Sequence, residues 1–305
     1  VLWSGGFGLR DKNKPGSGPP LPSDLVRIAS ITKAYTDTLL YVLRDAGTVG
    51  LDDELATHLP GFSMRNPYGT AGKVTLRNLA SHLAGIPREM PWPCTLDQHQ
   101  CAESDVLDNL RSVMPVSPPN RRFHYSNLGI ALLGRALAHA AATTATPPSF
   151  EALLAEKVLA PLGMVNATFD TAKVLAANQR AVGTTSSGDF VNVSNTCQPT
   201  PGAPGGWGAP CGCLWASADD MAKFMMLFFR DDVPAGASPS QILDGDTLRE
   251  ALLPSVLLRD GSSAVGTPWE VKYSSGVWMK GKQGELPGYR SSVTLVEELK
   301  LGVFV

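Results

Sequence analysis

The chain has 305 residues, of which 43% are hydrophobic and 18% charged, so it can bury a large core in one domain or in two interleaved ones. Its 26 basic and 28 acidic side chains give a net charge of -2. A chain this close to neutrality has no global field that would gather nucleic acid or hold it on anionic lipid. We therefore expect a small-molecule or peptide partner and no nucleic acid, while the composition leaves the oligomeric state unknown.

Short runs of β-branched and aromatic residues, interrupted by glycine, predict strands at both ends, in Val1–Leu9 and Val271–Val305. Between Leu51 and Phe229, stretches rich in Ala and Leu predict helices separated by Pro-rich loops. The clearest of these helices are expected at Leu128–Ala142, Phe150–Leu159 and Ala218–Phe229.

Isolated strands at the two ends would be unstable apart, so we expect both ends to meet in one sheet. The predicted fold class is α+β: an antiparallel sheet formed from both chain ends, flanked by helices, with an inserted and mostly helical region. We assign residues 1–60 and 230–305 to one discontinuous α/β domain, and residues 61–229 to the helical region.

No run of about 18 uninterrupted apolar residues occurs, so no membrane contact is expected from this chain. The longest candidate, Leu128–Ala142, is broken by Gly134, Arg135 and His139. The sequence begins at Val1 without a methionine and ends within an apolar run at Val305. We expect the natural protein to continue at both ends.

The five cysteines fall into two groups. Cys94 and Cys101 bracket a short polar loop, and Cys197 precedes Cys211 and Cys213 across a segment rich in Pro and Gly. This arrangement favours disulfides and a secreted or otherwise extracytoplasmic location, with free thiols as the alternative.

Cys94, His99 and Cys101 could also be interpreted as metal ligands. Two thiols and one imidazole lack the fourth partner that tetrahedral zinc needs. We therefore expect a disulfide across this loop, no metal site and no cofactor.

Ser30-Ile-Thr-Lys33 opens a helical pattern that ends near Gly47. Residues i and i+3 share a helix face, so the Lys33 amine can hydrogen-bond the Ser30 hydroxyl. The positive end of the helix would stabilise developing negative charge, which makes Ser30 a candidate nucleophile. The alternative is a serine that caps the helix and a solvated lysine in its first turn.

Several motifs, of which the first contains Ser30, occur in order along the chain. The set is Ile28–Lys33 (IASITK), Gly50–Asp53 (GLDD), Ser81–Pro87 (SHLAGIP), Tyr125–Asn127 (YSN), Cys211–Phe224 (CGCLWASADDMAKF) and Lys282–Tyr289 (KQGELPGY). This series resembles the serine β-lactamase and penicillin-binding-protein superfamily, and class C β-lactamase-like proteins in particular, with Tyr-x-Asn as the second motif. The resemblance spans nearly the whole chain and implies a serine hydrolase.

The resemblance implies that Ser30, Lys33, Tyr125 and Lys282 are catalytic. A tyrosine has a pKa near 10, so Tyr125 can act as a base only if cations stabilise its phenolate, and Lys33 and Lys282 would supply two. Lys282 would also hold a substrate carboxylate. The alternatives are a half-buried structural aromatic at Tyr125 and a solvated edge-strand lysine at Lys282.

The implied substrate-binding residues are Asn127, Gln283, Gly284 and Glu285. Asn127 would orient a substrate amide through its two-sided hydrogen bonding, with a turn-capping role as the alternative. Gly284 would let the backbone approach the substrate, and the amides of Ser30 and Glu285 would form the oxyanion hole.

Gln283 stands where the family usually carries Thr or Ser, which alters the recognition of a carboxylate. No separate carboxylate is identifiable that would activate a deacylating water. We therefore expect acyl-enzyme chemistry on an ester, amide or peptide. A D-amino-acid peptidase or transpeptidase and a true β-lactamase are alternatives, and a catalytically silent binding or scaffold protein is the non-enzyme alternative.

His82 and His124 invite comparison with a Ser-His-Asp triad. The sequence has no Gly-x-Ser-x-Gly motif to support one. We expect both histidines to be structural, with His82 fixing the turn before Gly85.

Overall fold

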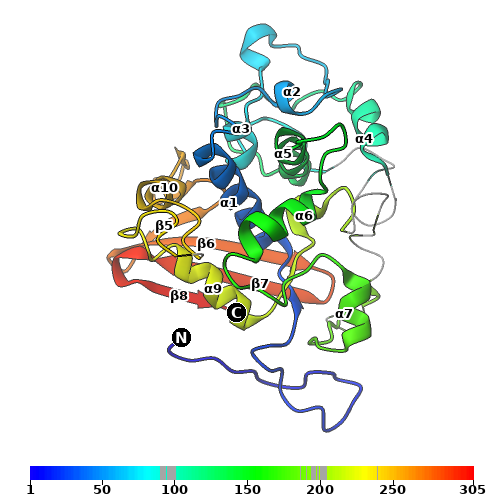
Figure 1. The fold of residues 1–305 in the computed structure, drawn as a ribbon, viewed down its shortest axis with the longest axis vertical. Helices are drawn as coiled ribbons and strands as arrows, with labels where there is room; N and C mark the ends of the chain where they lie inside the picture. Colours follow the sequence, from blue (N-terminus) through cyan, green and yellow to red (C-terminus); the bar gives the residue numbers. More distant parts are fainter. Residues whose placement is uncertain are drawn as a thin grey trace.

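A computed structural model gives the fold of the chain. It describes all residues except 90–93, 95–100, 186, 190, 194–196, 198, 200–204 and 239. Helices and antiparallel strands combine in an α+β architecture, which confirms the predicted fold class. Helix α1 lies in the middle, with the sheet on one side of it and the helices α2–α5 on the other (Figure 1).

The helices occupy most of the middle of the sequence. Their bounds are α1 (Thr32–Asp45), α2 (Leu55–His58), α3 (Leu76–Ala80), α4 (Glu103–Leu110), α5 (Asn127–Ala140), α6 (Phe150–Leu154), α7 (Thr171–Ala177), α8 (Ala209–Gly212), α9 (Ala218–Leu227) and α10 (Gly245–Ala251). A π-helical segment, Ala155–Leu159, continues α6, and a 3-10 turn, Ala29–Ile31, precedes α1. The three helices that the sequence predicts most clearly are confirmed as α5, α6 with its π-helical extension, and α9.

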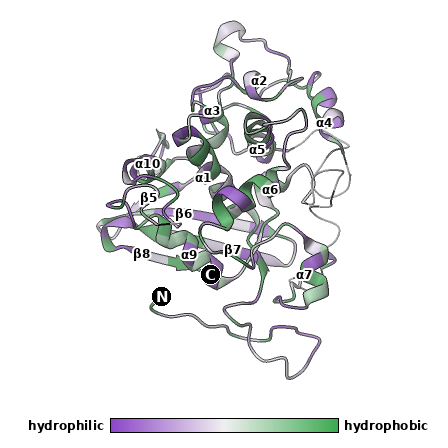
Figure 2. Ribbon diagram, in the orientation of Figure 1, coloured by the Kyte–Doolittle hydropathy of each residue, from purple (hydrophilic) through white to green (hydrophobic). Residues whose placement is uncertain are grey.

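Helix α5 forms the centre of the helical part. It begins at a cap, because the Ser126 hydroxyl accepts a hydrogen bond from the Gly129 amide at 2.7 Å. Its residues from Leu128 to Ala138 are all buried, and the helix is mainly hydrophobic in colour (Figure 2). Such a helix is stable only when neighbours cover every face, so α5 organises the packing around it.

The main sheet has six strands in the order β3-β4-β5-β6-β7-β8, with each neighbouring pair antiparallel. The strands are β3 (Val256–Leu257), β4 (Ser263–Val265), β5 (Glu270–Ser274), β6 (Val277–Leu286), β7 (Tyr289–Val296) and β8 (Leu301–Phe304). A separate two-stranded sheet pairs β1 (Val26–Arg27) with β2 (Trp215–Ala216).

The prediction that the N-terminal end contributes a strand to the main sheet is wrong. Residues 1–24 contain no strand, and the side chains of Val1, Leu2 and Phe7 are 84%, 96% and 82% exposed. The first residues lie beside β8 without forming a ladder with it. This stretch contains three glycines, which disfavour a regular strand and leave no side chains to pack at those positions.

One apolar core joins the helices to the sheet. Leu39 of α1, Leu133 of α5 and Val293 of β7 are fully buried in the same cluster. Helix α1 packs against α5 and α8, so the N-terminal part of the chain is embedded in the helical part. The division into residues 1–60 with 230–305 and residues 61–229 stays a prediction.

The longest described helices, α1 and α5, have 14 residues each. Within the part of the chain that the structure describes, none of the helices combines the length and apolar composition needed to cross a bilayer.

Two disulfides are present, Cys94–Cys101 and Cys197–Cys213, while Cys211 is a buried free thiol. The expected disulfide across the first polar loop is confirmed. His99 lies outside the described residues. Among the residues that the structure describes, no cluster of three His, Cys, Asp or Glu side chains could hold a metal ion.

Candidate active site

Ser30 lies in the 3-10 turn that leads into α1. Lys33 Nζ is 3.0 Å from Ser30 Oγ. Ala29 has a positive φ of 47°, and Thr32 Oγ1 donates to its carbonyl oxygen at 2.6 Å, which fixes the turn. The N-cap residue of α1 is Ile31, without a side-chain cap, so the alternative of Ser30 as a helix cap is wrong.

Lys33 is completely buried, which excludes the alternative of a solvated lysine. Its Nζ also donates to the carbonyl oxygen of Cys211 at 2.5 Å. Burial lowers the pKa of Lys33 from 10.5 to about 8, against the opposing influence of nearby anionic groups. The amine can therefore change protonation state close to neutral pH while it stays in contact with Ser30.

Tyr125 approaches Ser30 from the loop before α5, and its hydroxyl donates to Ser30 Oγ at 2.8 Å. Burial raises the pKa of Tyr125, and the nearby Lys282 charge opposes that rise without cancelling it. Burial thus favours the neutral phenol over the phenolate, and a role of Tyr125 as a base stays a prediction.

His82 supports Tyr125. Its ring centroid lies 4.5 Å from that of Tyr125, and its Nδ1 accepts a hydrogen bond from the Ser126 amide at 3.2 Å. Burial keeps the pKa of His82 well below 6.5, so the ring stays uncharged. These contacts agree with the predicted structural role.

Three cations surround the Tyr125 ring. Lys33 Nζ, Lys282 Nζ and Arg88 Cζ lie 4.9, 5.1 and 4.8 Å from its centroid. The sequence analysis missed Arg88, because it follows the SHLAGIP motif without a pattern of its own.

Lys282 lies on β6, an inner strand, and its side chain is 3% exposed, so the solvated edge-strand alternative is wrong. Its Nζ pairs with Glu270 Oε1 on β5 at 2.5 Å. The partner carboxylate is 49% exposed and was not identified from the sequence, since it becomes a neighbour only through strand pairing. The Lys282 charge is therefore already compensated.

Gly284 allows β6 to lie directly against the turn that holds the nucleophile. A Cβ atom at Gly284 would be 2.2 Å from the carbonyl oxygen of Ile28 and 2.5 Å from Ser291 Oγ. Ser291 Oγ itself donates to the Ile28 carbonyl oxygen at 2.9 Å. Only a glycine permits this approach.

Six of the eight predicted site residues line one open cavity of about 550 Å³. They are Ser30, Tyr125, Lys282, Gln283, Gly284 and Glu285. Lys33 lies buried behind Ser30. Asn127 is not part of this lining, and its Nδ2 donates to Glu89 Oε1 at 2.9 Å, so its role toward substrate stays a prediction.

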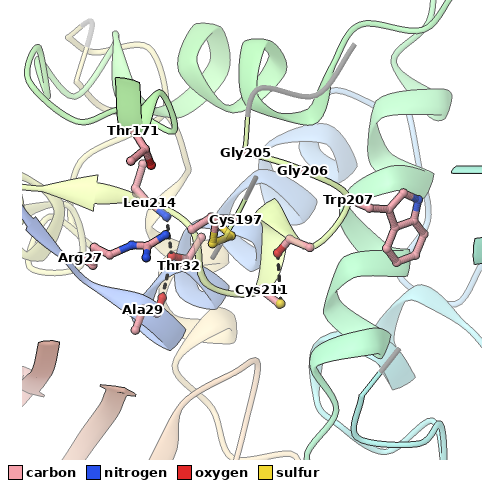
Figure 3. The surroundings of a disulfide bond; sticks show 12 residues. Arg27, Ala29, Thr32, Thr171, Cys197, Gly205, Gly206, Trp207, Cys211 and Leu214 are labelled. Carbon is pink, nitrogen blue, oxygen red and sulfur yellow. Dashed lines mark hydrogen bonds between the residues drawn. A yellow bond between two sulfur atoms is a disulfide. The ribbon is translucent and has the colours of Figure 1, made fainter. Parts of the chain in front are cut away.

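A disulfide-linked segment lies beside Ala29 and Thr32, the residues that flank the nucleophile in its turn (Figure 3). The Leu214 amide donates to Thr32 Oγ1 at 3.2 Å, and Cys213 in the same segment is bonded to Cys197. Cys211 supplies the carbonyl that Lys33 contacts. The sequence could not reveal this support, because the Leu214 amide and the Cys211 carbonyl are backbone groups that reach the turn only through the fold.

A family model described as Beta-lactamase matches residues 1–305. The chain is 38% identical over 310 residues to Beta-lactamase-like protein 2 of Dictyostelium discoideum, covering 99% of this chain. It is 26% identical over 322 residues to D-alanyl-D-alanine-carboxypeptidase/endopeptidase AmpH of Escherichia coli (strain K12), covering 96% of this chain and 74% of the relative. The chain spans about half the length of the first Dictyostelium relatives, 53% of Beta-lactamase-like protein 2 and 49% of Beta-lactamase-like protein 4.

Solved structures give the same fold. The octameric penicillin-binding protein homologue from Pyrococcus abyssi has a TM-score of 0.79 at 22% identity, over 100% of this chain and 66% of that chain. A class C β-lactamase has a TM-score of 0.77 at 16% identity, over 98% and 80%. These likenesses show the fold, and the family match shows the relationship. The chain therefore belongs to the Beta-lactamase family.

Proposed function

We propose that this protein is a serine hydrolase that forms an acyl-enzyme on Ser30. The observation that carries the proposal is the double contact on Ser30 Oγ, with Lys33 Nζ at 3.0 Å and Tyr125 Oη at 2.8 Å. A serine hydroxyl is a weak nucleophile until a neighbouring group can take its proton. Here the Lys33 amine can accept a proton when it is neutral, and the Tyr125 hydroxyl can donate one.

In the proposed first step, Ser30 Oγ attacks the carbonyl carbon while the neutral Lys33 amine takes the hydroxyl proton. The backbone amides of Ser30 and Glu285 receive the resulting oxyanion. The tetrahedral intermediate then expels the leaving oxygen or nitrogen, which receives a proton from Tyr125, and Lys33 returns one to the phenol. Water or another acceptor takes the acyl group in the second step.

The charges around the cavity favour substrates whose acyl part is neutral. The three cations that line it each lie within 3.1 Å of a carboxylate oxygen. The pairs are Arg88–Glu89 at 3.1 Å, Lys282–Glu270 at 2.5 Å and Arg290–Glu285 at 2.9 Å. A substrate carboxylate would have to compete with these partners, and Gln283 offers no hydroxyl to assist it. We therefore propose a neutral ester, amide or peptide as the substrate class.

We further propose that the protein works in an oxidising compartment outside the cytoplasm. Two disulfides close short loops, and such bonds persist where thiols are not kept reduced.

A fluorophosphonate probe, intact-mass measurement and peptide mapping test the nucleophile. We expect one adduct on Ser30 that is absent from Ser30→Ala and present in Ser112→Ala, which replaces an exposed serine just after the end of α4. An adduct on another residue would refute the assignment. Complete absence of labelling would favour the silent binding protein.

A further inference from the structure

Asp37 is a buried carboxyl group that the proposed reaction does not use. It lies on α1 and is 1% exposed. Neither Oδ1 nor Oδ2 has a hydrogen-bond partner among the residues that the structure describes. Burial of an ionised carboxyl group without such a partner is costly, so Asp37 is either neutralised by a proton or stabilised by nearby positive charges.

Two lysines of the candidate active site are the positive charges nearest in effect to Asp37. Asp37 follows Lys33 by four residues, and residues i and i+4 of a helix share one face. The charges of Lys33 and Lys282 both act on the Asp37 carboxyl and favour its ionised form. Asp37 thus lies one helical turn behind the amine that contacts Ser30.

We propose that Asp37 is a positioning residue whose carboxylate stabilises the charged form of Lys33 and so sets the pH at which Ser30 becomes reactive. This inference rests on the proposed function. An anion beside an amine favours its ammonium form, whereas burial favours the neutral amine. Without Asp37, burial acts on Lys33 with less opposition, and the amine loses its proton at lower pH.

Several other titratable groups surround this pair. They are Tyr41 on α1, Cys211 on α8, His82, Arg88, Glu89 and Tyr125 in the helical part, and Glu270 and Lys282 in the sheet. Burial raises the pKa of Cys211 to about 11 and of Tyr41 to about 12, so both are neutral near pH 7.

The two nearby glutamates differ from Asp37 in their exposure to solvent, although Glu89 also raises the pKa of Lys33. The side chains of Glu89 and Glu270 are 45% and 49% exposed, so solvent screens their charges. Burial also raises the pKa of Asp37 well above its usual range, against the two lysine charges, which couples the two titrations. In the proposed arrangement the shared proton resides on Lys33, and Asp37 is ionised.

The Asp37→Asn variant removes the charge and keeps the shape. The rate of fluorophosphonate labelling is measured against pH, and we expect the midpoint of its acid limb to move down by about one pH unit. Glu151→Gln is the matched control, because Glu151 is also a buried carboxyl, 4% exposed, but pairs with Arg135 away from the site. A purely structural role for Asp37 would change thermal stability and leave the midpoint in place.

A second measurement does not depend on activity. NMR titration of protein carrying ¹³C-labelled lysine, with the Lys33 signal assigned through Lys33→Arg, should show the Lys33 midpoint falling by the same amount in Asp37→Asn. Asp37→Ala makes the same charge change if the first variant does not accumulate. An unchanged Lys33 midpoint overturns the inference, whereas missing Ser30 labelling in the wild type overturns only the proposed function.

Discussion

The Nζ atom of Lys33 lies 2.5 Å from the carbonyl oxygen of Cys211, a residue 178 positions further along the chain. A carbonyl oxygen accepts a hydrogen bond from an ammonium and from a neutral amine alike. This contact therefore holds Lys33 in place while its protonation state changes. It leaves the amine 3.0 Å from Ser30 Oγ.

Acylation of Ser30 is expected to increase with pH and to level off above about pH 8. Burial lowers the pKa of Lys33 to about 8, and only the neutral amine accepts the Ser30 proton. Labelling rates between about pH 5 and 10 measure this limb. Lys33→Arg keeps the charge but cannot release its proton, so its labelling should fall by about 1000-fold. A wild-type rate that does not vary with pH would contradict this role of Lys33.

Gly284→Ala should abolish the approach of β6 to the nucleophile turn. Its Cβ would lie 2.2 Å from the Ile28 carbonyl oxygen, so the strand or the turn must shift. We expect labelling of Ser30 to fall by about 100-fold and stability by about 1–3 kcal/mol.

Gly281→Ala is the control on the same strand, where the nearest atoms to a Cβ are 3.7 Å away. It should keep the wild-type labelling rate. Equal rates in the two glycine variants would show that the approach at Gly284 does not matter for the reaction.

Loss of the Cys197–Cys213 disulfide should affect both stability and reactivity. The double variant Cys197→Ser/Cys213→Ser is expected to lose about 3 kcal/mol of unfolding free energy. Labelling should also slow, because Cys213 holds the segment that carries the Cys211 carbonyl.

The second disulfide provides the comparison for this effect. Cys94→Ser/Cys101→Ser should lower the melting temperature without slowing Ser30 labelling at a temperature where both proteins are folded. Thermal denaturation measures the loss of stability, and labelling rates measure the loss of reactivity. If Ser30 labelling slows equally in both double variants, the Cys211 segment has no specific role.

Glu270→Gln should change which substrates are accepted. Removal of the carboxylate that pairs with Lys282 at 2.5 Å leaves that ammonium free to attract an anion. We expect kcat/KM for an ester with a carboxylate in its acyl part to rise by about tenfold relative to a neutral ester, the equivalent of about 1.4 kcal/mol.

Glu297→Gln breaks the comparable pair with Lys280, also on β6 but outside the cavity lining. Its substrate preference should match that of the wild type. If both variants show the same preference between the carboxylate-bearing and the neutral ester, Glu270 does not compensate the Lys282 charge.

Local sequence was sufficient for some parts of the site. Ser30 and Lys33 are three residues apart, so a helical spacing alone predicts their contact. Tyr125 and Lys282 lie far away along the chain and were identified through the resemblance to a family. Arg88 and Glu270 escaped both routes, because they belong to no motif and meet the site only through packing and strand pairing.

The strand predicted at the N-terminal end, which does not form, shows where a local residue pattern is not enough to predict structure. Val1–Leu9 has the residue types of a strand, yet a strand exists only where a partner backbone accepts its hydrogen bonds. The periodic pattern of α5 was a safer guide, because a helix satisfies its own backbone hydrogen bonds within one segment.

The amino-acid sequence alone was enough to predict the family, the α+β class, the main helices and the candidate nucleophile with its adjacent lysine. Only the folded chain showed the partner of Lys282, the burial that raises the pKa of Tyr125, and the burial of Asp37 one helical turn from Lys33. The physical reason is that a short-range pattern fixes backbone form and side-chain spacing. Charge states depend on burial and on neighbours that only the folded chain brings together.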